Sequence, residues 1–145
     1  MLAAGNGGSA ADAQHFVGEL VGRFLRERAA LPAVSLCTDP STVTSIGNDY
    51  GYEQVFARQV QGLGAAGDVF LGISTSGRSP NIVCAMREAR KRGMTVIGLL
   101  GGDGGAALPL CDIALVVPAD KAARIQEVHT FVVHILCEMI ERGIQ

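Results

Sequence analysis

The chain has 145 residues and a formal net charge of −2, and 48% of its residues are hydrophobic while 5% are aromatic and none is Trp. This length predicts one domain, and the composition predicts a core of Val, Ile, Leu and Ala. The small negative charge excludes the broad basic surface that grips a nucleic-acid backbone or an anionic membrane, so we expect neither partner.

The four cysteines lie far apart, form no Cys-x-x-Cys pair, and each stands in an apolar run; they are Cys37, Cys84, Cys111 and Cys137. This pattern is typical of buried free thiols in a reducing compartment. No apolar stretch reaches the ~20 residues of a membrane span, and no signal peptide opens the chain. We therefore expect a soluble, cytoplasmic protein.

Short apolar runs rich in β-branched residues alternate with longer segments of helical period. After an initial strand stub in MLAAGNGGS, strands are expected at 33–36, 68–73, 95–100 and 112–117, and helices at 9–28, 52–64, 80–93 and 121–142. Gly93 is expected to end its helix. The alternation predicts an α/β fold with parallel strands, and the continuous apolarity of the strands predicts burial on both faces. No internal domain boundary is indicated, so residues 1–145 are expected to form a single domain.

The first candidate feature is the Gly-rich turn formed by Asn6, Gly7, Gly8 and Ser9. Ser9 is expected to cap the following helix, with Asp12 returning a hydrogen bond as in a capping box. The free amides at a helix start attract an anion. A purely structural turn explains this segment equally well.

A second hydroxyl-rich loop follows the strand at 68–73 and precedes Pro80, a residue favoured at the first helical position. Its members are Ser74, Thr75, Ser76, Gly77 and Ser79. Ligands bind at the carboxyl ends of strands in open α/β sheets, and hydroxyls with backbone amides can hold a phosphate without Lys or Arg. The loop therefore predicts a phosphate site, with a hydroxyl-rich cap that binds nothing as the alternative.

His15 and Glu19 stand four residues apart in the first helix, so they share one face. They could ligate a metal or flank a substrate. The alternative is a hydrogen-bonded His beside a solvated Glu, which is the commoner situation for one such pair.

The last helix carries polar residues amid apolar ones, namely Gln126, Glu127, His129 and His134. Gln126 and His134 are separated by about 12 Å of helical rise, too far to meet at one small site from one straight helix. Helix spacing makes His129 the better neighbour of Gln126. If Gln126 and His134 both serve catalysis, we expect different subunits to contribute them.

Asn48 and Asp49 lie in the segment IGNDYGY, which we interpret as turn-rich. Polar side chains there could reach substrate hydroxyls from a flanking loop, although turn chemistry alone explains them. The GGDGG stretch around Asp103 reads as a flexible loop, and we assign it no role.

Four segments, GNGGSAADAQHF, GNDYGY, GDVFLGISTSGRSPN and ARIQEVHTFVVHIL, occur in this order. The chain resembles the phosphoheptose isomerases of the SIS family across nearly its whole length. The resemblance implies a flavodoxin-like three-layer sandwich with a mostly parallel sheet, and a homotetramer. Members of that family begin with an N-terminal helix that we expect this chain to lack.

The resemblance also implies an activity and a set of roles. The family converts sedoheptulose 7-phosphate to D-glycero-D-manno-heptose 7-phosphate through an enediol, in heptose biosynthesis for surface glycans such as lipopolysaccharide. Its substrate contacts correspond to Asn6, Gly7, Gly8, Ser9, Glu19, Asn48, Asp49, Ser74, Thr75, Ser76, Ser79 and Gln126. Its zinc ligands correspond to His15, Glu19, Gln126 and His134, and its acid/base pair to Glu19 and His134.

In this hypothesis Glu19 moves a proton between two carbons while His134 serves the oxygens, roles suited to a carboxylate and an imidazole. Zinc could polarise the carbonyl, but a Glu19 bound to the metal would be a weaker base. The alternative is a non-catalytic SIS protein that binds a replication initiator or another protein. Those relatives do not keep Glu19 and His134 as a pair. A sugar-phosphate-sensing domain would need a fused effector module that the sequence does not show.

Overall fold

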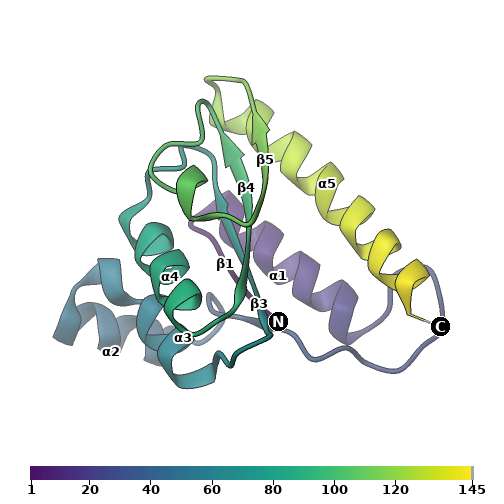
Figure 1. The fold of residues 1–145 in the computed structure, drawn as a ribbon, viewed down its shortest axis with the longest axis horizontal. Helices are drawn as coiled ribbons and strands as arrows, with labels where there is room; N and C mark the ends of the chain where they lie inside the picture. Colours follow the sequence, from purple (N-terminus) through teal and green to yellow (C-terminus); the bar gives the residue numbers. More distant parts are fainter. Residues whose placement is uncertain (145) are drawn as a thin grey trace.

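One sheet of five parallel strands organises the molecule in the computed structural model, which describes residues 1–144 (Figure 1). The strands are β1 (Leu2–Ala4), β2 (Val34–Ser35), β3 (Val69–Ser74), β4 (Thr95–Gly101) and β5 (Ile113–Val117). Their order is β2-β1-β3-β4-β5, and every neighbouring pair is parallel. This is the flavodoxin-like order of the doubly wound folds, so the expected fold class is confirmed.

Helices cover both faces of the sheet (Figure 1). On one face lie α1 (Gly8–Val21) and α5 (Ala122–Gly143), and on the other lie α2 (Pro40–Tyr50), α3 (Ala57–Leu63) and α4 (Pro80–Lys91). Two short 3₁₀ turns, η1 (Tyr52–Gln54) and η2 (Leu108–Leu110), complete the chain. The expected three-layer sandwich is therefore confirmed. Among residues 1–144, no helix is both long and apolar enough to cross a membrane.

Two hydrophobic cores result, one on each side of the sheet. On the central strand β3, Phe70 contributes to the core beneath α3 and α4, while Leu71 and Ile73 contribute to the core beneath α1 and α5. This division follows from the alternation of side chains along a strand. All four cysteines are free thiols, but only Cys137 is buried and the other three are half-buried.

The edge strand β5 departs from the prediction. Ile113 is 60% exposed and Leu115 is 37% exposed, so continuous apolarity here does not mean burial on both faces. The prediction is correct for the central strand β3, where all residues after Val69 are buried. An edge strand has a sheet neighbour on one side only, and the described helices leave the start of β5 uncovered.

The helices also differ from the sequence-based expectation in three main respects. Helix α1 ends at Val21, not near residue 28, and the segment 52–64 divides into η1 and α3. The segment before Gly51, interpreted as turn-rich, forms α2. Asp39 starts α2 by accepting hydrogen bonds from the amides of Ser41 and Thr42, and Pro40 follows at the first helical position. This start signal outweighs the low helix propensity of the Ser and Thr residues that follow.

The early end of α1 is explained by a buried ion pair between Arg28 and Glu141 (3.1 Å). The Arg28 guanidinium donates to the carbonyls of Glu19 (2.7 Å) and Leu20 (2.8 Å) in the last turn of α1. Glu141, on α5, is 3% exposed and also accepts hydrogen bonds from three consecutive amides, those of Phe24, Leu25 and Arg26. Burial raises the pKa of the Glu141 carboxyl, but the three amides and Arg28 outweigh it, so the pKa lies below its usual value.

Candidate functional site

The two loops singled out in the sequence lie side by side at the carboxyl edge of the sheet. Strands β1 and β3 are neighbours, with Ala4 opposite Gly72, so the turns that follow them leave the sheet together. The side-chain amides of Asn6 and Asn81 join the two loops through a pair of 2.9 Å hydrogen bonds. Helices α1 and α4 therefore start next to each other, and two helix N-termini can attract an anion at this edge.

The turn before α1 differs from the predicted capping box. Gly7 is the N-cap, with a φ of 54°, and no side chain caps the helix. Ser9 consequently lies inside α1 and is buried. Asp12 is also buried, and its carboxylate accepts a hydrogen bond from the Thr130 hydroxyl on α5 (2.8 Å). The prediction was wrong because glycine, which readily adopts a positive φ, lets the helix begin before Ser9.

The hydroxyl-rich loop is stabilised by its own hydrogen bonds and by close packing against the GGDGG stretch. The hydroxyls of Ser74 and Ser79 lie 3.1 Å apart and share a hydrogen bond, and the Ser76 hydroxyl accepts from the Arg78 amide (3.1 Å). Gly77, with a φ of 62°, lies so close to the backbone of Gly104 that an added Cβ would come within 3.0 Å of it. The GGDGG stretch, which was assigned no role from the sequence, thus supports the hydroxyl-rich loop.

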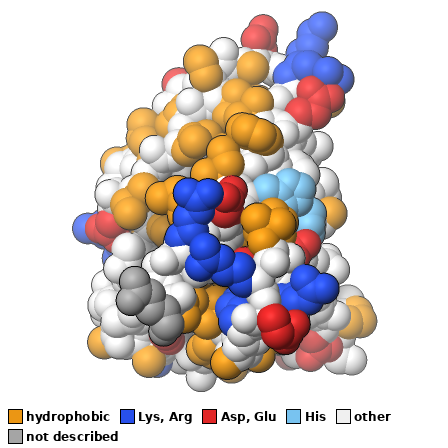
Figure 2. Space-filling view, turned by 90° about the vertical axis from the view of Figure 1, so that its right-hand side faces the viewer, with side chains coloured by type: hydrophobic (Ala, Val, Ile, Leu, Met, Phe, Trp, Pro, Cys, Tyr) orange, Lys and Arg blue, Asp and Glu red, His pale blue; other side chains and the backbone are white. Residues whose placement is uncertain are grey.

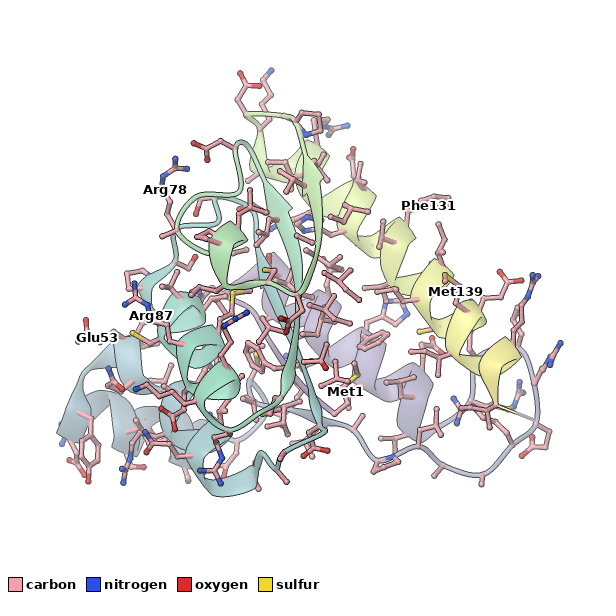
Figure 3. The ribbon with its side chains drawn as sticks, in the orientation of Figure 1. Met1, Glu53, Arg78, Arg87, Phe131 and Met139 are labelled. Atoms are coloured by element: carbon pink, nitrogen blue, oxygen red, sulfur yellow. The ribbon has the colours of Figure 1, made fainter. Side chains whose placement is uncertain are left out.

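An ion pair on the surface links the same two loops. The Arg78 guanidinium donates to the Asp103 carboxylate (2.6 Å), and both side chains are largely exposed. The hydrogen bond raises the pKa of Arg78 and lowers that of Asp103. Arg78 points outward from its loop at the edge of the molecule (Figure 3). A cation therefore stands beside the predicted phosphate loop with its charge balanced by a carboxylate.

Beside these loops lies a cavity of about 400 Å³, lined by Asn6, Gly51, Tyr52, Glu53, Ser79, Pro80 and Asn81. Its volume is within the usual range for small-molecule sites. Asn6 and Ser79 were predicted to contact substrate, whereas Tyr52 and Asn81 were not singled out. Asn81 stands within the GDVFLGISTSGRSPN segment, and only its position at the start of a helix hinted at a role.

Helices α1 and α5 pack side by side and run in the same direction (Figure 1). Three contacts follow this parallel register: Gly8 with Gln126, Asp12 with Thr130, and His15 with His134. An added Cβ on Gly8 would lie 2.6 Å from the Gln126 amide nitrogen. Gln126 therefore lies at the loop end of the helix pair, whereas His134 lies about two turns further along.

A second polar cluster, formed by His15, Glu19 and His134, lies about two helical turns away from the loops. Nε2 of His15 lies 3.1 Å from Oε1 of Glu19, as their spacing predicts. The rings of His15 and His134 meet edge to face with centroids 4.9 Å apart, and the Phe24 ring stacks on His134 at 5.6 Å. Histidine side chains reach the surface here, among hydrophobic and charged neighbours (Figure 2). The structure thus brings together a carboxylate and two imidazoles.

His129, which helix spacing favoured as the neighbour of Gln126, is a core residue. It is fully buried, and its Nε2 lies 3.0 Å from the carbonyl oxygen of Leu100 on β4. Burial lowers its pKa, which favours the neutral ring. Among the described residues its Nδ1 has no hydrogen-bond partner. His129 is therefore buried in the core, unlike His134, which is half-buried beside His15.

Asn48 and Asp49 lie at the exposed end of α2, where the Asn48 amide donates to the Asp49 carboxylate (2.8 Å). Within residues 1–144, neither forms a hydrogen bond with the other predicted site residues. The chain then passes through Gly51 to Tyr52, whose hydroxyl donates to Asn6 (3.2 Å). The sequence placed these two residues near the site, but the direct contact with the first loop comes from Tyr52.

The cluster of His15, Glu19 and His134 offers two imidazoles and a carboxylate, which are among the ligand types that zinc prefers. As arranged, however, no group of three or more His, Cys, Asp or Glu side chains in the described part of the chain could hold a metal ion. Gln126 lies at the other end of the helix pair, against Gly8. One chain by itself therefore does not present the expected set of four ligands.

The SIS domain family model matches residues 1–101, which carry both loops and the first four strands. The fold and the paired loops thus define an SIS-domain protein. The chain is 60% identical over 143 residues to a phosphoheptose isomerase of Nitratiruptor sp., an alignment that covers 99% of this chain and 76% of that relative.

Two solved structures of phosphoheptose isomerases have the same fold as this chain. The phosphoheptose isomerase from Neisseria gonorrhoeae superposes with a TM-score of 0.92 at 50% identity, covering 97% of this chain and 75% of that one. The enzyme from Francisella tularensis superposes with a TM-score of 0.93 at 47% identity, with the same coverage. The chain belongs to the phosphoheptose isomerase family, which confirms the resemblance found in the sequence.

Proposed function

We propose that this protein isomerises sedoheptulose 7-phosphate to D-glycero-D-manno-heptose 7-phosphate, in heptose biosynthesis. Membership of the phosphoheptose isomerase family supports an aldose–ketose isomerase acting on a sugar phosphate. The observation that carries the proposal is the junction of the two loops through Asn6 and Asn81, which unites two helix N-termini and a row of hydroxyls at one edge of the sheet. Lipopolysaccharide as the final product and a cytoplasmic location belong to the same proposal.

The substrate's phosphate binds at the joined loops. Its ligands are the amides and side chains of Asn6, Gly7, Gly8, Ser9, Ser74, Thr75, Ser76 and Ser79. Backbone amides at helix starts and hydroxyls suffice to hold a phosphate dianion. Gln126, Asn48 and Asp49 then contact the sugar hydroxyls. We treat residues 1–145 as one SIS domain, because a single sheet carries every strand of the described chain.

The chemistry transfers two protons and no other group. Glu19 removes a proton from C1 of the ketose, the C–H electron pair forms the C1–C2 double bond, and the C2 carbonyl oxygen takes a proton from His134. The resulting enediol receives the proton from Glu19 at C2, while His134 takes back a proton from the oxygen on C1, which becomes the aldehyde. Both residues end the cycle in their starting state. The contact of His134 with His15, which in turn approaches Glu19, supports this pairing.

The phosphate site and the acid/base pair stand apart on a single chain. About 16 Å of helical rise separates Gly8 from Glu19 on α1, a span longer than the carbon chain of the substrate. We therefore propose that the loops of one subunit face the Glu19 and His134 of another in a homotetramer. The outer face of α5 supports assembly, since Phe131 is 64% and Met139 is 62% exposed and both point away from the molecule (Figure 3).

Zinc bound by His15, Glu19 and His134 of one subunit and by Gln126 of another is also part of the proposal. When bound, zinc would polarise the carbonyl oxygen of the substrate. The scheme above does not depend on it. Metal analysis of the purified protein before and after chelation tests the point, because one zinc per subunit supports the ligand set whereas a metal-free, fully active protein removes zinc from the reaction.

The direct test follows aldose formation from sedoheptulose 7-phosphate. We expect turnover that Glu19→Gln abolishes and that Glu27→Gln leaves intact, because Glu27 is largely exposed and, within residues 1–144, forms an ion pair with Arg23 alone. Undiminished turnover in Glu19→Gln would remove Glu19 from the mechanism. Absence of turnover in the unaltered protein would favour the alternative, a non-catalytic SIS protein that binds a protein partner.

A subunit-mixing experiment tests the shared site. Glu19→Gln and Ser79→Ala proteins, each with low activity, are mixed and allowed to exchange subunits. If loops and acid/base residues come from different chains, some sites in the mixed tetramers combine two intact halves, and activity recovers. A monomeric protein, or mixed tetramers without recovery, would contradict the arrangement.

A further inference from the structure

We propose that Asn81 and Tyr52 are positioning residues that fix the orientation of the Asn6 side-chain amide, so that Asn6 presents an N–H group to the phosphorylated substrate. This inference rests on the proposed function, since it concerns the same phosphate site. It gives roles to two residues that the sequence did not single out. Neither needs to touch the substrate to fulfil its role.

The three side chains form a closed hydrogen-bond network. The Asn6 amide nitrogen donates to Oδ1 of Asn81 (2.9 Å), and the Asn81 amide nitrogen donates to Oδ1 of Asn6 (2.9 Å). The Tyr52 hydroxyl donates to the same Asn6 oxygen (3.2 Å). The partners come from three separate parts of the chain: the turn after β1, η1, and the first turn of α4. The network therefore couples the two loops to the segment that follows α2.

The direction of every bond follows from one backbone group. The Ile82 amide donates to Oδ1 of Asn81 (3.0 Å), and a backbone N–H cannot accept a hydrogen bond. Asn81 must therefore place its oxygen at this position and its NH₂ group toward Asn6. Asn6 must then turn its own oxygen toward Asn81. An amide that would otherwise be free to flip is thereby held in one orientation.

Among residues 1–144, the Asn6 side chain keeps one N–H group that is free to donate to a ligand. Both lone pairs of its oxygen are used, by Asn81 and Tyr52, and one of its two N–H bonds is directed to Asn81. In the described chain, nothing accepts its second N–H. Asn6 lines the cavity of about 400 Å³ together with Ser79. The remaining capacity is thus a donor, which suits a phosphate oxygen and disfavours a group that can only donate.

Burial separates the roles of the two asparagines. Asn81 is 2% exposed, whereas Asn6 is only half-buried. A ligand in the cavity can reach Asn6, whereas Asn81, which lines the same cavity, has almost no exposed surface to offer a ligand. Replacement of Asn81 should therefore change ligand binding only through Asn6, and this dependence can be measured.

The test is a double-mutant cycle with Asn6→Ala and Asn81→Leu, read out by calorimetric binding of inorganic phosphate. We expect Asn81→Leu alone to weaken phosphate binding about tenfold, the usual effect of one hydrogen bond to a charged group. In the Asn6→Ala background, the same change should alter binding less than about twofold. Loss of stability is expected in both backgrounds, because the Ile82 amide loses its acceptor; equal losses of phosphate affinity in both would overturn the proposal.

A pair of tyrosine variants provides a milder test. Tyr52→Phe removes one hydrogen bond to Asn6 and should weaken phosphate binding about two- to threefold. Tyr50→Phe is the matched control, since Tyr50 is 55% exposed and its ring lies under Arg58. Equal behaviour of the two variants would exclude a role for the Tyr52 hydroxyl. Turnover of sedoheptulose 7-phosphate is measured separately, so loss of the proposed reaction and loss of the positioning effect are distinguishable.

Discussion

Gly77 offers a quantitative test of the contact between the hydroxyl-rich loop and the GGDGG stretch. Gly77→Ala adds a methyl group at a φ of 62°, in a place where a Cβ would come within 3.0 Å of three backbone atoms of Gly104 and Gly105. The left-handed conformation costs an Ala about 1 kcal/mol. Moving a backbone segment out of the way costs about 1–3 kcal/mol more, so we expect a total of about 2–4 kcal/mol.

Gly102→Ala is the matched control because Gly102 has nearly the same φ, 63°, and nothing lies within 4 Å of its added Cβ. Only the conformational cost of about 1 kcal/mol should apply there. At about 3 °C per kcal/mol, the melting temperature should fall by about 3 °C in the control and by about 6–12 °C in Gly77→Ala. Thermal unfolding followed by circular dichroism measures both.

Activity should separate the two variants more clearly. A shift of the hydroxyl-rich loop by about 1 Å would reduce kcat/KM about 100-fold in Gly77→Ala, whereas the control should stay close to the unaltered protein. Equal melting temperatures and equal kcat/KM for the two variants would refute the reasoning. It would mean that the GGDGG stretch yields freely and does not support the loop.

Three further predictions concern the helix pair. The pKa of the Glu141 carboxyl is lowered, so the stability that this carboxylate contributes is present above its usual pKa of 4.5 and is lost as the pH falls further. Glu141→Gln should therefore flatten the fall in melting temperature between pH 5 and pH 3. An unchanged slope would contradict this prediction. Burial raises the pKa of Cys137 to about 11, so it should react with iodoacetamide at pH 8 far more slowly than Cys84, which is half-buried. Mass spectrometry of the digested protein assigns each modified cysteine, and equal rates would contradict the prediction. His134→Gln should lower kcat by at least about 100-fold with little change in phosphate affinity, whereas a loss of phosphate binding would place His134 in the loop site.

The sheet was predictable because its strands are short, continuous runs of β-branched and aliphatic residues. Residues 95–100 were expected as a strand and form most of β4. Helix α2 was missed because the residues after Pro40 are mostly Ser and Thr, which have modest helix propensity. The Asp39-Pro40 start signal was nevertheless present in the sequence.

The candidate site was predictable only in part, since sequence spacing reports neighbours along one helix and not the direction in which each side chain points. His129 and His134 are both close to Gln126 in the sequence, but the rotation of α5 directs His129 to the Leu100 carbonyl and His134 to His15. That rotation is set by packing against the sheet and α1. The spacing of His15 and Glu19 was sufficient because both lie on one helix.

The network around Asn6 could not be found from local pattern. Asn6 and Asn81 are 75 residues apart, and their contact depends on β1 and β3 being adjacent in the sheet. Tyr52 reaches Asn6 from η1, which directly follows α2, a helix that was itself not expected. Long-range hydrogen bonds of this kind follow from topology and register, which the sequence alone did not provide.

The hydrogen bonds between Glu141 and the amides of residues 24–26 make the last turn of α5 relevant to His134, the proposed acid/base residue. Phe24, one of these residues, covers the face of the His134 ring. Removing the last five residues would remove Glu141. The Phe24 ring would then lose the hydrogen bond that holds its backbone in place beside the His134 ring. A purification tag fused directly after the final helix threatens the same contact.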